Sequence, residues 1–290
     1  MTVTRAAEPV QGTQVVYLKW PQYLDWLNGK LTTAPDPWGA PVDLGPPWAP
    51  GQHMPIIGPT GCAKTTHAVG VLKECRKYVI ALDPKGEDET LTASGFIRVK
   101  ELPQTGISSL TGKDQGAWRR IFKDIEEGRP AKVLVGGGAR STAQDEALRR
   151  LIGETISYVR HAGGWCFYVD EFELLSSPRM MGLGSMIERM LITSRRDKSS
   201  VVTSFQAPAW VSKHSTRQSM KAVVYPQAKP MVKNIGEEMS WDWRELGAIL
   251  DELPPFHTAT IGRGTQAGPA VITMAPKLPE RKPRTEAPRR

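Results

Sequence analysis

The sequence has little of what marks a secreted, membrane-bound or metal-clustered protein. Its three cysteines form no C-x-x-C pair, so it encodes neither a disulfide framework nor a zinc ribbon, and its five histidines show no metal-ligand spacing. No apolar run approaches the roughly 18 residues that span a bilayer, and Met1–Val10 contains no hydrophobic signal region. We therefore expect a cytoplasmic protein with no membrane anchor.

A strong charge excess is also missing. The chain has 38 Lys and Arg against 30 Asp and Glu, a net charge of +8, and half of that excess lies in Lys277–Arg290. The remainder is too small to demand a polyanionic partner, so any contact with nucleic acid must come from a local basic patch. The tail of residues 277–290 also contains three prolines and is expected to be disordered.

Lys and Arg are absent from Ala34–Pro50, where six prolines and two tryptophans gather. This composition favours an extended path outside helices and sheet ladders. We place a boundary there, between an N-terminal extension of residues 1–50 and a domain of residues 51–276. Within the extension, Pro21–Gly29 predicts a short helix that either packs on its own domain as a flap or reaches a neighbouring subunit as an arm.

Short apolar runs alternate with amphipathic stretches through the central region, which is typical of a parallel sheet covered by helices. The expected strands are Met54–Gly58, Tyr78–Asp83, Phe96–Val99, Ala131–Val135, Trp165–Asp170, Val201–Gln206 and Ala222–Tyr225. After them, Thr258–Gly262 is expected to pair with Ala270–Met274. The fold class is therefore α/β, with a mostly parallel sheet flanked by helices and a C-terminal hairpin.

Helical periodicity is clearest in Ser141–Arg160, which Ser141 begins with a capping box. Asp114–Glu127 repeats the same apolar spacing. A further helix is expected over Trp241–Leu253, with Ser240 as its N-cap.

A phosphate-binding loop follows the first strand of the domain. Its residues are Gly58, Pro59, Thr60, Gly61, Cys62, Ala63, Lys64, Thr65 and Thr66. Such a loop directs backbone N–H groups and the positive end of a helix at phosphate oxygens. Lys64 is expected to reach the β- and γ-phosphates of ATP, Thr65 to bind Mg²⁺ and Thr66 to touch the α-phosphate. Ala63 departs from the G-x-x-x-x-G-K-[ST] pattern, since it replaces the second glycine and narrows the backbone freedom of the loop.

Two acidic residues, Asp170 and Glu171, end the apolar strand around Val169. A buried strand delivers such residues to the C-terminal end of a parallel sheet, where ligands bind. Asp170 is expected to hold Mg²⁺ and Glu171 to polarise the water that attacks the γ-phosphate. Glu173 is a lesser candidate that we expect to be solvated.

Together with the loop, three segments carry a family resemblance. They are Ala81–Glu87 (A-L-D-P-K-G-E), Tyr168–Phe172 (Y-V-D-E-F) and Val201–Gln206 (V-V-T-S-F-Q). Over Pro55–Met274 the sequence resembles the FtsK/HerA superfamily of DNA-pumping ATPases, which includes viral genome-packaging ATPases and conjugative coupling proteins. The resemblance implies a P-loop NTPase fold of the RecA-like, ASCE type.

The resemblance also assigns roles to residues outside the loop. It makes Gln206 a sensor of the γ-phosphate, and it makes Arg195 or Arg196 an arginine that enters the active site of a neighbouring subunit in a homo-oligomeric ring. Ordinary surface arginines would fit these two positions equally well, and Arg140 is a weaker rival for the role. Two further positions, Asp83 and Lys85, match the family motif without separate chemical roles.

These features favour a motor that hydrolyses ATP and moves double-stranded DNA without reading its sequence. Basic loop residues are expected to grip the phosphates, although a merely solvated basic surface fits them as well; they are Lys213, Arg217, Lys229 and Lys233. Coupling proteins usually carry membrane anchors and large terminases carry a nuclease, and neither is expected here. A viral packaging ATPase that acts with a capsid portal in the host cytoplasm fits best.

Other functions remain open at this stage. The motif set also suits an ATPase for DNA transfer, assembly or secretion, including one that uses nucleotide only to lock an oligomer. A small-molecule kinase is a further use of the phosphate-binding loop, but it has less need of Glu171.

Overall fold

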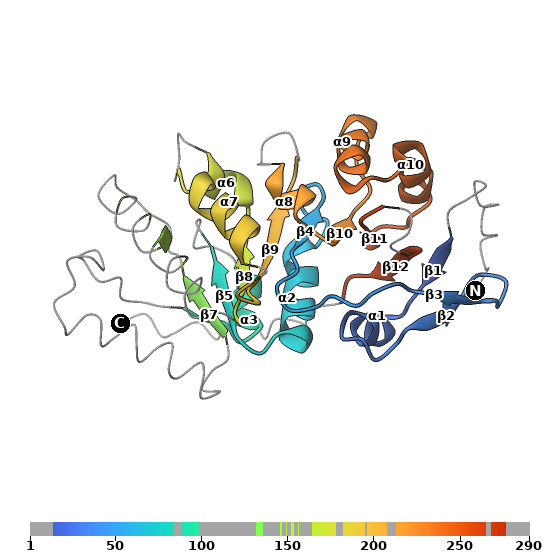
Figure 1. Ribbon diagram of the computed structural model, residues 1–290, viewed down its shortest axis with the longest axis horizontal. Coiled ribbons are helices and arrows are strands. Elements are labelled where there is room, and N and C mark those ends of the chain that lie inside the picture. Colours follow the sequence, from blue (N-terminus) through green and yellow to red (C-terminus); the bar gives the residue numbers. More distant parts are fainter. Residues whose placement is uncertain are drawn as a thin grey trace, which may run out of the picture.

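The computed structural model describes residues 14–83, 89–98, 132–135, 146, 149, 152–153, 156, 164–177, 182–194, 196–207, 213–264 and 268–276. A ten-stranded sheet of order β1-β12-β11-β10-β4-β9-β8-β5-β7-β6 forms the centre of this part of the chain (Figure 1). The strands are β1 (Val15–Tyr17), β4 (Met54–Ile57), β5 (Val79–Leu82), β6 (Ile97–Arg98), β7 (Lys132–Val135), β8 (Cys166–Val169), β9 (Ser200–Phe205), β10 (Lys221–Val224), β11 (His257–Gly262) and β12 (Ala270–Met274). Neighbouring strands of this sheet are parallel except where β11 pairs with β10 and with β12.

The order of the three central strands decides where the functional residues meet. Strand β9 lies between β4, which leads into the phosphate-binding loop, and β8, which leads into the acidic pair. Ile57 is in register with Phe205, and Val169 with Thr203. Because the three strands run parallel, their C-terminal ends lie together.

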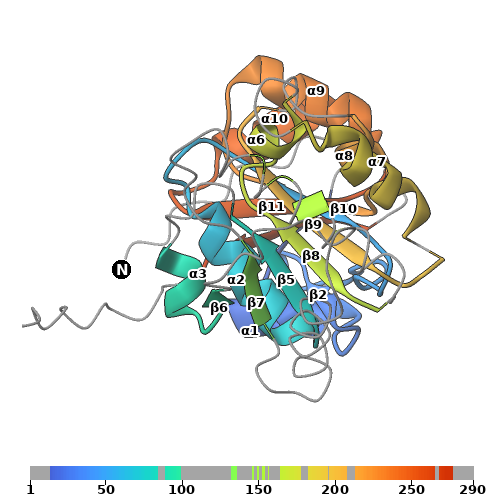
Figure 2. The same cartoon turned by 90° about the vertical axis from the view of Figure 1, so that its left-hand side faces the viewer.

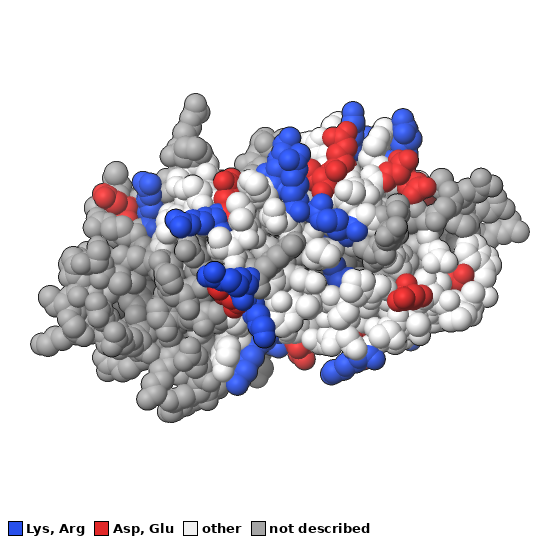
Figure 3. Space-filling model, viewed as in Figure 1, with Lys and Arg blue, Asp and Glu red and all other residues white. Residues whose placement is uncertain are grey.

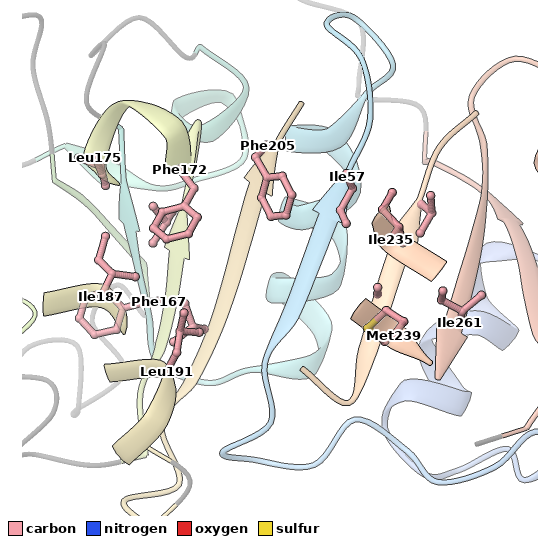
Figure 4. Packing of buried hydrophobic residues seen from close by; sticks show 14 of the residues in the cluster. Ile57, Phe167, Phe172, Leu175, Ile187, Leu191, Phe205, Ile235, Met239 and Ile261 are labelled. Atoms are coloured by element: carbon pink, nitrogen blue, oxygen red, sulfur yellow. The ribbon is translucent and has the colours of Figure 1, made fainter. Parts of the chain in front are cut away.

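The strands are apolar on both faces because helices cover both faces. Figure 2 shows α1 (Trp20–Leu27), α2 (Lys64–Cys75) and α3 (Glu89–Ala93) on one side of the sheet, and α6 (Phe172–Ser176), α7 (Gly184–Thr193), α8 (His214–Arg217), α9 (Lys229–Met239) and α10 (Trp243–Asp251) on the other. Side chains alternate between two cores, so Phe167 and Val169 face α6 and α7 whereas Cys166 and Tyr168 face α2. The first core is drawn in Figure 4.

The sequence predictions for the central sheet are confirmed, including the hairpin of β11 and β12. Helix Asp114–Glu127 and the tail of residues 277–290 lie outside the described residues. Of Ser141–Arg160, the described positions are helical. No helix within the described ranges is long and apolar enough to cross a membrane.

The proline-rich segment was predicted wrongly. Strands β2 (Thr33–Pro35) and β3 (Pro41–Asp43) form an antiparallel two-stranded sheet instead of an unpaired extended path. The turn between them closes because the Asp36 carboxylate accepts the backbone N–H of Trp38 (2.9 Å) and of Ala40 (2.8 Å). Proline has no N–H group to donate, but so short a pair of strands needs few hydrogen bonds between them and therefore tolerates it.

The N-terminal segment shares the core of the domain. Strand β1 pairs parallel with β12, with Val16 opposite Val271, and Leu18 continues the ladder by donating to the Ile272 carbonyl (2.9 Å). Helix α1 packs against α2, and its buried Tyr23, Trp26 and Leu27 join the core on that face. The predicted short helix therefore exists and packs as a flap on its own chain.

The N-cap predicted for the last helix was also wrong. Ser240 is in the left-handed conformation (φ 60°) and ends α9. Asp242 caps α10 instead, because its carboxylate accepts the backbone N–H of Arg244 (2.7 Å). Both residue types favour caps, so the sequence alone did not separate them.

Candidate active site

The phosphate-binding loop begins where β4 ends, at Gly58. The N–H of Gly58 donates to the Phe205 carbonyl across 3.2 Å, which fixes the start of the loop to β9. A Cβ atom on Gly58 would lie 2.7 Å from Cys62 Sγ and 2.8 Å from Tyr225 Cβ, closer than real Cβ contacts. Glycine is therefore required here by close approach and not by its φ angle.

At the end of the loop it is the φ angle, and not a close approach, that would favour glycine. Ala63, at the position of the missing glycine, is the N-cap of α2 and lies in the left-handed region with φ 76°. That conformation costs a non-glycine residue of order 1–2 kcal/mol. Ala63 has no capping side chain, so the positive end of α2 remains for an anionic ligand.

Lys64 lies over the loop. Its ammonium donates to the carbonyl oxygens of Gly58 and Pro59, each at 2.8 Å. These bonds fold the side chain back across the bend, where phosphate groups would lie in a loop of this kind.

The acidic pair is held from the neighbouring strand. Asp170 is 9% exposed, and its Oδ1 accepts hydrogen bonds from the Tyr168 hydroxyl (2.7 Å) and the Ser204 hydroxyl (2.5 Å). Glu171 follows in a left-handed conformation (φ 46°), and its N–H donates to Ser204 Oγ across 3.3 Å. Strand β9 thus contacts both acids through one serine.

Tyr168 joins this group to the phosphate-binding loop. Burial raises the pKa of its hydroxyl well above the usual value, the Asp170 carboxylate raises it further, and interactions with the Ser204 and Thr65 hydroxyls oppose the shift. Thr65 and Asp170, the two residues expected to hold Mg²⁺, therefore both interact with one phenol, which donates a hydrogen bond to Asp170. Tyr168 and Ser204 were missed by sequence reasoning, although Tyr168 lies two residues before Asp170 and so on the same face of β8.

Glu173 is not solvated, which corrects the sequence expectation. It is half-buried, and its Oε1 accepts the backbone N–H of Gln206, just past the end of β9. Burial raises the pKa of its carboxyl group, whereas backbone N–H donors including that of Ala207, and the nearby Lys64 charge, lower it. Glu173 therefore fastens the start of α6 to the tip of β9.

Arg196, one of the two expected arginines, does not join this group. Arg196 precedes β9, whereas the loop and the acids lie beyond the other end of a six-residue strand, about 20 Å away at 3.3 Å per residue. Its side chain is 92% exposed and pairs with Asp197 at 3.3 Å. Buried His53 holds this end of β9 by bonding the Leu191 carbonyl (2.9 Å) and accepting the Val201 N–H (3.0 Å).

Three other candidates, Arg195, Arg140 and Lys85, lie outside the described residues. Asp83 is buried directly after β5. Lys64, Thr65, Asp170, Glu171 and Gln206 all belong to segments that follow the C-terminal ends of β4, β8 and β9.

The basic residues expected in loops lie mostly on helices, which corrects that prediction. Lys213 precedes α8, Arg217 lies in α8, and Lys229 and Lys233 lie in α9. Acidic residues accompany them: Lys233 pairs with Glu237 at 3.9 Å, and the charges of Arg217 and Lys213 lower the pKa of Glu238 against the larger effect of its burial. Figure 3 shows blue and red side chains interleaved over these helices.

Solved structures share this architecture. The genome packaging NTPase B204 of Sulfolobus turreted icosahedral virus 2 superimposes with a TM-score of 0.53 at 13% identity, covering 79% of this chain and 98% of that chain. VirB4 of Thermoanaerobacter pseudethanolicus gives 0.55 at 12% identity, covering 96% and 99%. This chain has the P-loop NTPase fold.

A third structure with the fold is the bacterial conjugative coupling protein TrwBdeltaN70, with a TM-score of 0.53 at 12% identity, covering 94% of this chain and 96% of that chain. The sequence itself matches no family model and no curated protein. The P-loop NTPase fold predicted from the sequence is confirmed, with β9 inserted between the strand of the loop and the strand of the acids.

The site fits a magnesium nucleotide better than a protein-caged metal. Among the described residues, no group of three or more His, Cys, Asp and Glu could hold a metal ion. Mg²⁺ in nucleotide sites is bound by one or two protein oxygens together with phosphate and water. Thr65 in the first turn of α2 and Asp170 after β8 provide two such oxygens at the same end of the sheet.

Proposed function

We propose that this protein is an ATP-hydrolysing motor that moves double-stranded DNA and packages a viral genome into a capsid. One observation carries the ATPase part: Gly58 of the loop bonds Phe205 of β9 and Ser204 of β9 bonds both acids, so the loop and the acidic pair lie together at the C-terminal ends of β4, β8 and β9. The fold is also that of B204. The B204 structure in complex with AMPPCP superimposes on this chain with a TM-score of 0.51 at 14% identity.

Each residue has a role in this proposal. Lys64 neutralises the β- and γ-phosphates, and the N–H groups at the start of α2 bind phosphate oxygens. Thr65 and Asp170 hold Mg²⁺, which supplies charge neutralisation for phosphoryl transfer. Glu171 accepts a hydrogen bond from the attacking water and orients it, and Gln206 contacts the γ-phosphate.

The ATPase test uses the full chain. Lys64→Ala is expected to abolish ATP binding or turnover, and Glu171→Gln to abolish phosphate release while ATP still binds. The exposed Glu252→Gln is the matched control and should hydrolyse ATP normally. Undiminished turnover in Glu171→Gln would remove the hydrolytic role of that residue.

The DNA part needs its own experiment. ATP hydrolysis measured with and without long duplex DNA, with particles counted by electron microscopy, should show stimulation by DNA and a ring of subunits. Binding should weaken steeply with salt and vary little with base sequence, because phosphates are the contacts. A strong base preference in a competition assay would contradict this.

The basic residues near α8 are the expected DNA contacts. Lys213→Ala combined with Arg217→Ala should reduce the salt dependence of duplex affinity by about two counterions. Lys30→Ala is the control, because Lys30 is a 72% exposed lysine paired with Asp25 outside these helices. Equal losses in both variants would assign the effect to net charge alone.

Transfer of DNA or protein by a related motor is the second candidate, favoured by the fold shared with VirB4 and the coupling protein. ATP turnover that duplex DNA does not change would favour an assembly or secretion ATPase. Transfer of the γ-phosphate to a metabolite would instead establish a small-molecule kinase.

A further inference from the structure

Two hydroxyl groups converge on one carboxylate oxygen next to the phosphate-binding loop. Tyr168 and Ser204 each donate their single proton to Oδ1 of Asp170, at 2.7 and 2.5 Å. The two hydroxyl oxygens also lie 3.2 Å from each other, so the Tyr168 proton is within reach of Ser204 as well as of Asp170. Two donors on one oxygen fix the rotation of a carboxylate that a single donor would leave adjustable.

The same hydroxyls reach beyond Asp170 on both sides. Ser204 Oγ uses its lone pair to accept the N–H of Glu171, a residue in strained left-handed geometry. The Thr65 hydroxyl, in the first turn of α2, is close enough to Tyr168 to lower the pKa of its phenol. The chain of contacts therefore runs from α2 through β8 to β9 and back to the acidic pair.

Burial makes these contacts consequential. Tyr168 and Ser204 have no exposed surface, so water does not replace a bond that is lost. Partners of this kind, which orient a metal ligand without touching the metal, commonly change metal affinity or activity by about 10- to 100-fold when removed.

We propose that Tyr168 and Ser204 are positioning residues that set the Mg²⁺ ligand Asp170 and, through Ser204, the water-orienting Glu171. This inference rests on the proposed function in taking magnesium nucleotide as the ligand and Glu171 as the residue that orients water. Ser204 lies near the end of β9 and Gln206 follows that strand directly, so β9 both holds the two acids and leads to the proposed γ-phosphate sensor.

The test measures metal binding apart from turnover. Mn²⁺ binding to the protein–ADP complex is followed by electron paramagnetic resonance, and ADP binding is measured separately in EDTA. Tyr168→Phe, which removes only one oxygen atom, and Ser204→Ala are each expected to weaken Mn²⁺ binding by about 10-fold or more. ADP affinity in EDTA should change by less than about threefold.

A matched control lies one residue away. Thr203 is buried on the same strand but faces the other side of the sheet, so Thr203→Val removes a hydroxyl outside the network and should leave Mn²⁺ affinity unchanged. Because both hydroxyls act on one oxygen, the double variant Tyr168→Phe with Ser204→Ala should lose less than the product of the single losses.

The outcomes separate this inference from the proposed function. Unchanged Mn²⁺ affinity in both single variants overturns the positioning role, and so does an equal loss of ADP affinity in EDTA, which would indicate general damage to the site. A parent protein that binds no Mn²⁺ with ADP overturns it too. Normal Mn²⁺ binding in a parent protein that does not hydrolyse ATP would refute the motor and leave the positioning role standing.

Discussion

The hydroxyl of Tyr225, one residue beyond β10, donates a hydrogen bond across 3.1 Å to the carbonyl oxygen of Ala63. The body of the same ring packs beside Gly58, so one side chain supports both ends of the phosphate-binding loop. Its own N–H donates to the Ile57 carbonyl at 2.9 Å, which anchors this support in the sheet.

Tyr225→Phe should therefore weaken ATP binding without unfolding the protein. Loss of one hydrogen bond of this type costs about 1 kcal/mol, which corresponds to roughly a fivefold change in affinity. Isothermal titration with a non-hydrolysable ATP analogue measures it. The control is Tyr78→Phe, because Tyr78 precedes the N-terminal end of β5 and so lies at the end of the sheet away from the loop. An equal loss of affinity in this variant would disprove a specific role for Tyr225.

The two small residues of the loop should respond in opposite ways. Gly58→Ala places a methyl group 2.7 Å from Cys62 Sγ, so the loop must shift, at a cost of about 1–3 kcal/mol. Ala63→Gly relieves the left-handed strain and should retain ATP affinity within about threefold. Thermal melts with and without ATP analogue measure both effects, and a tolerant Gly58→Ala would show that the close approach is unimportant.

Arg196 can act only on another subunit if it acts on phosphate at all, because β9 separates it from its own loop. In rings mixed from parent and Arg196→Ala subunits, turnover should fall by more than the fraction of variant subunits. Arg189→Ala, an exposed arginine of α7, is the comparison. Turnover strictly proportional to the parent fraction would exclude the role in trans.

Lys221 should make stability depend on pH. It is 1% exposed, its ammonium lies 4.1 Å from the centre of the Trp26 ring, and burial lowers its pKa from 10.5 to about 7. Between these values the unfolded chain holds a proton that the folded chain lacks, so the free energy of unfolding rises with pH across that window. The full effect is of the order of a few kcal/mol.

Lys221→Met should remove this slope and stabilise the protein below pH 7, where the parent keeps a buried charge. Urea unfolding at several pH values between 6 and 10 would show it. A variant whose stability follows the same pH profile as the parent would contradict the assignment to Lys221.

The sequence was most informative where a pattern is local. Runs such as Val79–Leu82 are apolar because both faces of the sheet are covered, and their length and flanks were enough to place them. The positions of Lys64 and the acidic pair at strand ends were predictable for the same reason, since each follows its strand within a few residues.

What failed depends on contacts distant in the sequence. The turn that lets β2 pair with β3 is stabilised by hydrogen bonds to Asp36, and the many prolines of the segment argued against any strand there. The Ser204 contact with Asp170 joins residues 34 apart and exists only because β9 lies next to β8, an order that no local pattern specifies. Glu173 was misjudged because its partner is a backbone N–H past the tip of β9.

The pairing of β1 with β12 has a practical consequence for handling the protein. A version shortened to start at Trp20 would uncover the backbone of Ala270–Ile272, whose side chains are fully or almost fully buried. An uncovered apolar border of this kind recruits strands from other molecules. Affinity tags should therefore be attached without trimming Val15–Tyr17, or purified material will precipitate for reasons unrelated to its catalytic machinery.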